Sequence, residues 1–90
     1  MKGTSMNNET LTSLADQVQK LIAEAFQVPS DLVTPELAFG DIPQWDSLGH
    51  MEIMLRLEEQ FGVKIDSDTI AELISVREIC QHLQELRYAQ

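Results

Sequence analysis

The chain has 90 residues, of which 43% are apolar and 23% charged, and this composition suits one small domain with an aliphatic core. Fifteen acidic against six basic residues give a net charge of −9, which argues against nucleic acid and anionic membranes as partners because both require clustered Lys or Arg. A single cysteine excludes an internal disulfide, and no signal peptide, membrane-spanning segment or metal-ligand spacing is recognisable, so we expect a monomeric cytoplasmic protein without a metal.

The first expected element is a long amphipathic helix. Residues 1–7 are polar and are expected to be disordered, which leaves residues 8–88 as the domain. From Asn8 to Phe26 the apolar residues follow helical spacing. They are Leu11, Leu14, Ala15, Val18, Leu21, Ile22, Ala25 and Phe26.

A long loop is expected next, from Gln27 to Trp45, since prolines and glycines interrupt this stretch. Loops of this length are commonly functional or are held down by their own side chains. We expect the apolar residues of the loop to enter the core, namely Val28, Leu32, Val33, Leu37, Phe39 and Ile42.

The second helix is predicted from Ser47 to Phe61, with Asp46 as its N-cap and Gly62 as its end. At 100° per residue, one face collects His50, Ile53, Met54, Leu57 and Phe61, and this face is predicted to be core. Leu48, Met51 and Leu55 form a second apolar stripe on the adjoining side. Two explanations remain open for that stripe: contact with another helix of the domain, or a docking surface beside Ser47.

Two further helices complete an all-α, four-helix arrangement. A short helix is predicted over residues 67–73, and Ser75 to Glu78 has the Ser-x-x-Glu pattern of a capping box. The helix that this box opens carries Val76, Ile79, Cys80, Leu83 and Leu86 on one face. Cys80 is therefore interpreted as a small buried hydrophobic residue.

Ser47 is the most informative residue, because a first-turn hydroxyl projects from the end of a helix. It can be modified, or it can act as a nucleophile. Nucleophilic catalysis would need a base oriented by a third group, but His50 is predicted to face the core and His82 lies among polar residues. The chain also lacks a Gly-x-Ser-x-Gly elbow, so we do not expect an enzyme.

The helix pattern and three stretches of sequence resemble those of acyl carrier proteins. The stretches are Asp46-Ser47-Leu48, Met51-Glu52-Ile53 and the segment Leu-Glu-Glu-Gln-Phe-Gly-Val-Lys-Ile at residues 57–65. The resemblance extends from about Leu11 to Leu86 and implies a four-helix carrier domain. It further implies that Ser47 is the attachment point of 4′-phosphopantetheine, transferred from coenzyme A by a phosphopantetheinyl transferase.

The same resemblance implies how such a carrier works. The thiol of the arm would hold an acyl group as a thioester for acyl-loading, acyl-transfer or condensing enzymes. Leu48, Met51 and Glu52 would belong to the partner-facing side of the second helix, Asp46 and Glu52 would offer acids to basic partners, and the apolar stripe adds Leu55 to the predicted recognition residues. A helix N-terminus also tolerates the phosphodiester anion.

Some residues depart from the fatty-acid synthesis type. That type usually has an acid after Asp-Ser-Leu, where this chain has Gly49, and Trp45 and His50 look more like stand-alone carriers of polyketide, nonribosomal-peptide or sugar-modification pathways. Replacing Gly49 by Asp is expected to leave stability intact. An aminoacyl, peptidyl or D-alanyl carrier is the first alternative, an unmodified helical interaction module the second, and a hydrolase that uses Ser47 the third.

Overall fold

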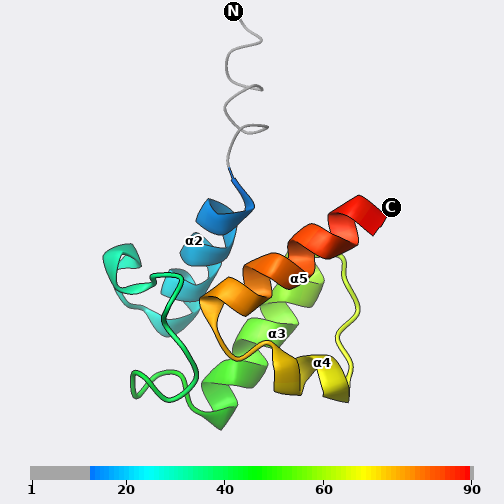
Figure 1. Ribbon diagram of the computed structural model, residues 1–90. Helices are drawn as coiled ribbons and strands as arrows, with labels where there is room; N and C mark the ends of the chain where they lie inside the picture. Colours follow the sequence, from blue (N-terminus) through cyan, green and yellow to red (C-terminus); the bar gives the residue numbers. More distant parts are fainter. Residues whose placement is uncertain (1–12, 90) are drawn as a thin grey trace, which may run out of the picture.

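A computed structural model describes residues 13–89, with side chains to residue 86. In this part of the chain there are no strands, and the elements are α2 (Leu14–Phe26), the 3₁₀ helix η1 (Ser30–Leu32), α3 (Ser47–Phe61), α4 (Ser67–Glu72) and α5 (Val76–Ala89). Figure 1 shows α5 crossing in front of α3, α2 beside them, and the short α4 next to the lower half of α3. The prediction of an all-α, four-helix fold is confirmed.

Helix α2 begins later than the sequence predicted. Ser13 has an extended backbone, with φ −67° and ψ 156°, and its side chain accepts a hydrogen bond from the amide of Asp16. A continuous helix through Ser13 is therefore wrong, because this serine acts as an N-cap instead of an interior residue. Residues 1–12, including the predicted disordered segment and Leu11, lie outside the described residues.

The long loop follows one side of the molecule down to the start of α3 (Figure 1). Val33 and Leu37 are buried as predicted, and Val28 and Ile42 pack partly against the core. The prediction that Leu32 and Phe39 enter the core is wrong, since each remains 43% exposed. Phe39 instead donates its backbone amide to the Ile74 carbonyl, next to an antiparallel bridge between Ala38 and Ser75.

Helix α3 has the predicted bounds and passes through the centre of the core. Gly62 ends it with a left-handed φ of 67°, a conformation that glycine adopts without steric cost. The predicted inner face is confirmed: His50, Ile53, Met54 and Leu57 are buried, while Phe61 is half-buried.

Helices α4 and α5 close the bundle. Asp66 caps α4, whose six residues end at Glu72, one residue before the predicted end. Ser75 acts as the predicted cap of α5: its hydroxyl accepts from the Glu78 amide at 3.2 Å and donates to the Glu78 carboxylate at 3.1 Å, so the carboxylate bonds the hydroxyl of Ser75 and not its amide. Among the described residues, no helix is both long and apolar enough to cross a membrane.

Candidate functional site

Ser47 is the first residue of α3, and its side chain is exposed. The turn that presents it is closed by Asp46, whose carboxylate accepts from the Gly49 amide at 2.8 Å. The Asp46 carbonyl accepts from the His50 amide, also at 2.8 Å. The predicted N-cap is thus confirmed, and the serine hydroxyl stands at the positive end of the helix dipole.

The loop before Ser47 is anchored by Trp45, which is fully buried. Its backbone amide donates to the Ile42 carbonyl, and its carbonyl accepts from the Gly40 amide, both at 3.0 Å. Its ring packs against Phe26 of α2 with the ring centroids 5.8 Å apart. The approach to Ser47 is therefore fixed from both the backbone and the core.

His50 is the buried polar residue of this region, with 5% of its surface exposed. The indole Nε1–H of Trp45 donates to His50 Nδ1 at 3.0 Å. Because an indole can only donate, Nδ1 must be an acceptor, and the ring proton then lies on Nε2. Nε2 is 2.8 Å from the Ile70 carbonyl oxygen of α4, to which it donates.

This geometry provides no activated nucleophile. Both nitrogens of His50 are occupied, by Trp45 and by Ile70, so this ring has no free nitrogen to accept a proton from Ser47. Within the described residues the Ser47 hydroxyl has no hydrogen-bond partner. What the site offers is an accessible hydroxyl that another enzyme can modify.

The second apolar stripe of α3 is exposed. Leu48 is 82% exposed, Met51 43% and Leu55 54%. Contact with another helix of the domain is therefore not the explanation for the stripe. Three large apolar side chains thus remain at least 43% exposed between Ser47 and Leu55, and this arrangement is typical of a surface that contacts other proteins.

The acidic residues near Ser47 are already engaged. Glu52 receives the Arg56 Nε–H at 2.7 Å in an i, i+4 ion pair, and Asp46 is occupied by the Gly49 amide. Further along α3, Glu58 accepts from the Ile65 amide at 2.9 Å. Arg56 therefore offsets the charge of Glu52 near Ser47, whereas Asp46 keeps its negative charge at the start of α3.

Gly49 has a structural role that the sequence did not reveal. A Cβ built on it would collide with the carbonyl oxygen of Gln44 and would lie 3.0 Å from Cε1 of Phe26. The expectation that Gly49→Asp leaves stability intact is therefore wrong, because the loop passes too close to α3 at this point.

Sequence reasoning also missed the structural role of Trp45, which it treated as the last residue of the loop and as a mark of carrier type, and not as a core residue. The available signal was His50 on the predicted core face, since a buried imidazole needs hydrogen-bond partners. The single Trp of the chain was a candidate donor. What the sequence could not give was the approach of the Ile70 carbonyl from α4.

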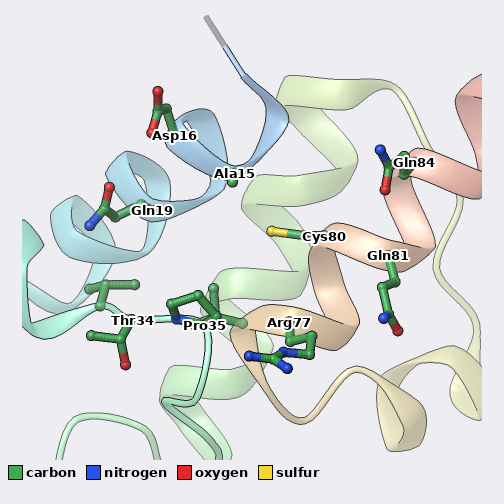
Figure 2. A pocket seen from close by; sticks show the side chains of 11 residues that line it. Ala15, Asp16, Gln19, Thr34, Pro35, Arg77, Cys80, Gln81 and Gln84 are labelled. Carbon is green, nitrogen blue, oxygen red and sulfur yellow. The ribbon is translucent and has the colours of Figure 1, made fainter.

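A groove of about 410 Å³ lies between α2, the loop at residues 33–35 and residues 76–84 of α5, and no residue of α3 lines it (Figure 2). Cys80 lies on its wall, and partial burial raises the pKa of the thiol, which disfavours the reactive thiolate form. At the rim, Arg77 pairs with Glu36 at 2.8 Å.

No cluster of His, Cys, Asp or Glu that could hold a metal ion occurs in the described residues.

Comparison with known proteins agrees with this geometry. A family model described as a phosphopantetheine attachment site matches residues 16–83. Acyl carrier proteins of three Helicobacter pylori strains are 31% to 32% identical over 77 residues, which cover 86% of this chain and 99% of the relative.

Proposed function

Since the chain belongs to the acyl carrier protein family, we propose that Ser47 carries its 4′-phosphopantetheine arm. Members of this family are carriers and not enzymes, and their arm is attached covalently. When bound, the arm supplies a terminal thiol that holds an acyl group as a thioester. In general, members depend on a phosphopantetheinyl transferase and on enzymes that load or use the acyl group.

One observation carries the assignment: Ser47 combines exposure, an unengaged hydroxyl and a helix N-terminus. In the transfer, a bond forms between Ser47 Oγ and the pantetheine-bearing phosphorus of coenzyme A. The pyrophosphate P–O bond breaks, adenosine 3′,5′-bisphosphate leaves, and the serine proton passes to a base of the transferase. The helix dipole then favours the phosphodiester anion at this position.

Ser67 provides an internal comparison. It follows Asp66 as Ser47 follows Asp46, it opens α4, and the Asp66 carboxylate accepts from the Thr69 amide at 2.9 Å. An Asp-Ser pair at a helix start is therefore not sufficient by itself. Ser47 differs in being followed by the exposed residues Leu48 and Met51, which we assign to the surface that the transferase contacts.

The experiment is mass spectrometry after incubation with coenzyme A and a phosphopantetheinyl transferase. Wild type and Ser67→Ala should each gain one pantetheine arm, mapped to Ser47. Ser47→Ala should fold with an unchanged circular dichroism spectrum and gain none. Loading of Ser47→Ala, or an arm mapped to Ser13, Ser67 or Ser75, would contradict the assignment.

We further propose that this carrier serves polyketide, nonribosomal-peptide or related specialised biosynthesis in the cytoplasm, as a monomer. Gly49 supports this, because the Gln44 carbonyl leaves no room there for the acid that fatty-acid carriers place after Asp-Ser-Leu. The ion pair of Glu52 with Arg56 also supports a specialised pathway, because it offsets an acidic charge beside Ser47. We propose Leu48, Met51 and Leu55 as the principal docking residues, with Asp46 and Glu52 at their edge.

The cargo distinguishes this proposal from its alternative. Mass spectrometry of the protein isolated from its native cell should show an acyl thioester on the arm. An amino acid on the arm would identify an aminoacyl, peptidyl or D-alanyl carrier. Isolation without any arm would favour an unmodified interaction module and would contradict the carrier role.

A further inference from the structure

Two consecutive hydrogen bonds, one buried and one partly buried, connect the turn before Ser47 with helix α4. They run from the indole of Trp45 to the imidazole of His50 and on to the carbonyl oxygen of Ile70, with separations of 3.0 and 2.8 Å. The two rings are stacked at an interplanar angle of 27°. Phe39 meets the imidazole edge-on, with its centroid 5.5 Å away.

These hydrogen bonds connect a buried part of the loop with a short helix at the surface. Trp45 lies in the loop that leads to Ser47, and it is fully buried. Helix α4 has six residues and none of them is buried; the nearest buried residue is Leu73, just after its end. Ile70 packs partly against the core, and its carbonyl is bonded to His50 of α3. This bond therefore adds a polar attachment to a helix of the kind that opens easily, because it is short and buries little surface.

Ser47 lies in the turn between Trp45 and His50, the two residues that the first of these hydrogen bonds joins. Trp45 and His50 bracket the segment from Asp46 to Gly49, and their side chains are bonded across it. The backbone amides at the end of the same segment are also bonded: the Gly49 amide donates to the Asp46 carboxylate, and the His50 amide donates to the Asp46 carbonyl. The side chain of Ser47 is free, whereas the backbone that carries it is held at both ends.

We propose that His50, acting with Trp45, is a positioning residue for the modification of Ser47 and couples the placement of α4 to that turn. This inference rests on the proposed function of Ser47. The imidazole contacts neither the hydroxyl nor the arm. It acts by keeping the turn in one geometry and by fastening α4 to the same ring.

Positioning of the Ser47 turn by His50 can be distinguished from simple filling of space in the core. A space-filling aromatic residue would need no hydrogen bonds, whereas here each ring nitrogen has a partner of the correct polarity. Positioning changes the reactivity of the hydroxyl after docking, so it should alter kcat. It should leave KM nearly unchanged, because Leu48, Met51 and Leu55 lie on the exposed side of α3.

The test uses the unloaded full chain as substrate for a phosphopantetheinyl transferase and coenzyme A. Trp45→Phe removes the indole donor, whereas His50→Phe keeps a ring but removes both bonds. We expect kcat to fall about tenfold in both variants, since misplacing a reacting group by about 1 Å can cost about a hundredfold. We expect KM to stay within about twofold, since the docking residues are unchanged.

Amide hydrogen exchange in α4 provides a readout that needs no loading. Exchange of the α4 amides should accelerate about tenfold or more in His50→Phe, whereas Trp45→Phe, which keeps the bond to Ile70, should match wild type. His50→Gln, whose amide has a donor and an acceptor, should recover a large part of the lost kcat. Ile79→Ala on α5 is the control for lost stability, because Ile79 is fully buried but lies outside this chain of bonds.

All variants are compared at a temperature at which circular dichroism shows them to be folded. The inference is overturned if kcat in the Trp45 and His50 variants equals that of Ile79→Ala. It is also overturned if the amide exchange rates of α4 in His50→Phe equal those of wild type. Should His50→Phe fail to fold, Trp45→Phe and His50→Gln decide on kcat and KM alone. A wild-type chain that is not loaded at all contradicts the proposed function, while the exchange result still tests the link to α4.

Discussion

At the scale of single residues, Gly49 makes the sharpest prediction. Replacing it by Ala should destabilise the fold by about 3 kcal/mol or more, because overpacking a tight contact usually costs about 1–3 kcal/mol and here the obstacle is backbone. That obstacle is the carbonyl of Gln44, and Cε1 of Phe26 would also lie 3.0 Å from the added Cβ. Urea unfolding of Gly49→Ala and Gly49→Asp measures the effect.

Gly62→Ala is the matched control. A Cβ at Gly62 meets nothing within 4 Å, but the residue has a left-handed φ of 67°. The cost should therefore be only the strain of that conformation, about 1–2 kcal/mol. A Gly49→Ala variant as stable as Gly62→Ala would show that the loop moves aside to accept the methyl group.

These two glycines also show what a sequence reveals about single residues. The cap at Gly62 and the N-cap at Asp46 were predictable, because each depends on neighbours within four positions along one helix. The role of Gly49 was not, because its constraint comes from a loop carbonyl whose path depends on the folded core. The Trp45–His50–Ile70 connection was hidden for the same reason, since Ile70 is 20 residues from His50.

At the scale of elements, the two faces of α3 should respond differently to truncation. Leu57 is fully buried, so Leu57→Ala should cost about 2–5 kcal/mol, as is usual for a core leucine. Met51 is 43% exposed, so Met51→Ala should cost much less, within about 1 kcal/mol. Denaturant titration of both variants measures the difference.

The functional readout should have the opposite order. At a temperature where both variants are folded, Met51→Ala should slow loading or transfer to partner enzymes, whereas Leu57→Ala should not. Leu48→Ala tests the same surface at its most exposed position. Equal loading rates for Met51→Ala, Leu48→Ala and wild type would show that partners do not use this stripe.

Helix α4 should respond to acid through its cap. Hydrogen bonds from the amide and the hydroxyl of Thr69 lower the pKa of Asp66 below its usual value of 3.8. A carboxyl with a lowered folded pKa stabilises above its unfolded pKa of about 3.9, and the contribution disappears as the pH falls through the folded value. Amide exchange in α4 should therefore accelerate below about pH 4 relative to the intrinsic rate.

Asp66→Asn is the control for this effect, because an asparagine can still cap a helix but does not titrate in that range. In this variant the acid-dependent part of α4 exchange should disappear. If α4 in Asp66→Asn shows the same acid dependence as wild type, another carboxyl is responsible.

The helices themselves were largely predictable. The bounds of α3 followed from apolar periodicity together with Asp46 and Gly62, which are local signals. The start of α2 was missed because periodicity continues past Ser13, while a serine can equally cap a helix or lie within one. Leu32 and Phe39 were misplaced because hydrophobicity alone does not show which loop residues reach the core. For Phe39, the backbone is held by the long-range bridge between residues 38 and 75.

At the scale of the whole molecule, net charge is a poor guide to the surface that partners meet. The chain carries −9 overall, but part of the acidic charge is paired with arginine. Arg56 pairs with Glu52 on α3, beside the exposed apolar stripe, and Arg77 pairs with Glu36 near the groove of Figure 2. The total charge can be read from the sequence, whereas the pairing of Arg77 with Glu36 depends on the fold, which brings residues 36 and 77 together.

These two arginines allow local charge to be separated from total charge. Arg56→Gln and Arg77→Gln each make the chain more negative by one unit, but only Arg56→Gln exposes an unpaired acid on α3. Against a basic transferase at low ionic strength, we expect Arg56→Gln to raise the loading rate about two- to threefold, in keeping with the strength of exposed charge pairs. Arg77→Gln should change it far less.

Loading rate measured against salt concentration checks the cause. Charges on a surface are screened over about 8–10 Å at ordinary ionic strength, so the gain in Arg56→Gln should disappear as salt is added. Stability should change by no more than about 1 kcal/mol in either variant, because both ion pairs are exposed. Equal acceleration by the two variants would mean that total charge governs the encounter. No acceleration by either would mean that the apolar contacts of Leu48 and Met51 determine recognition.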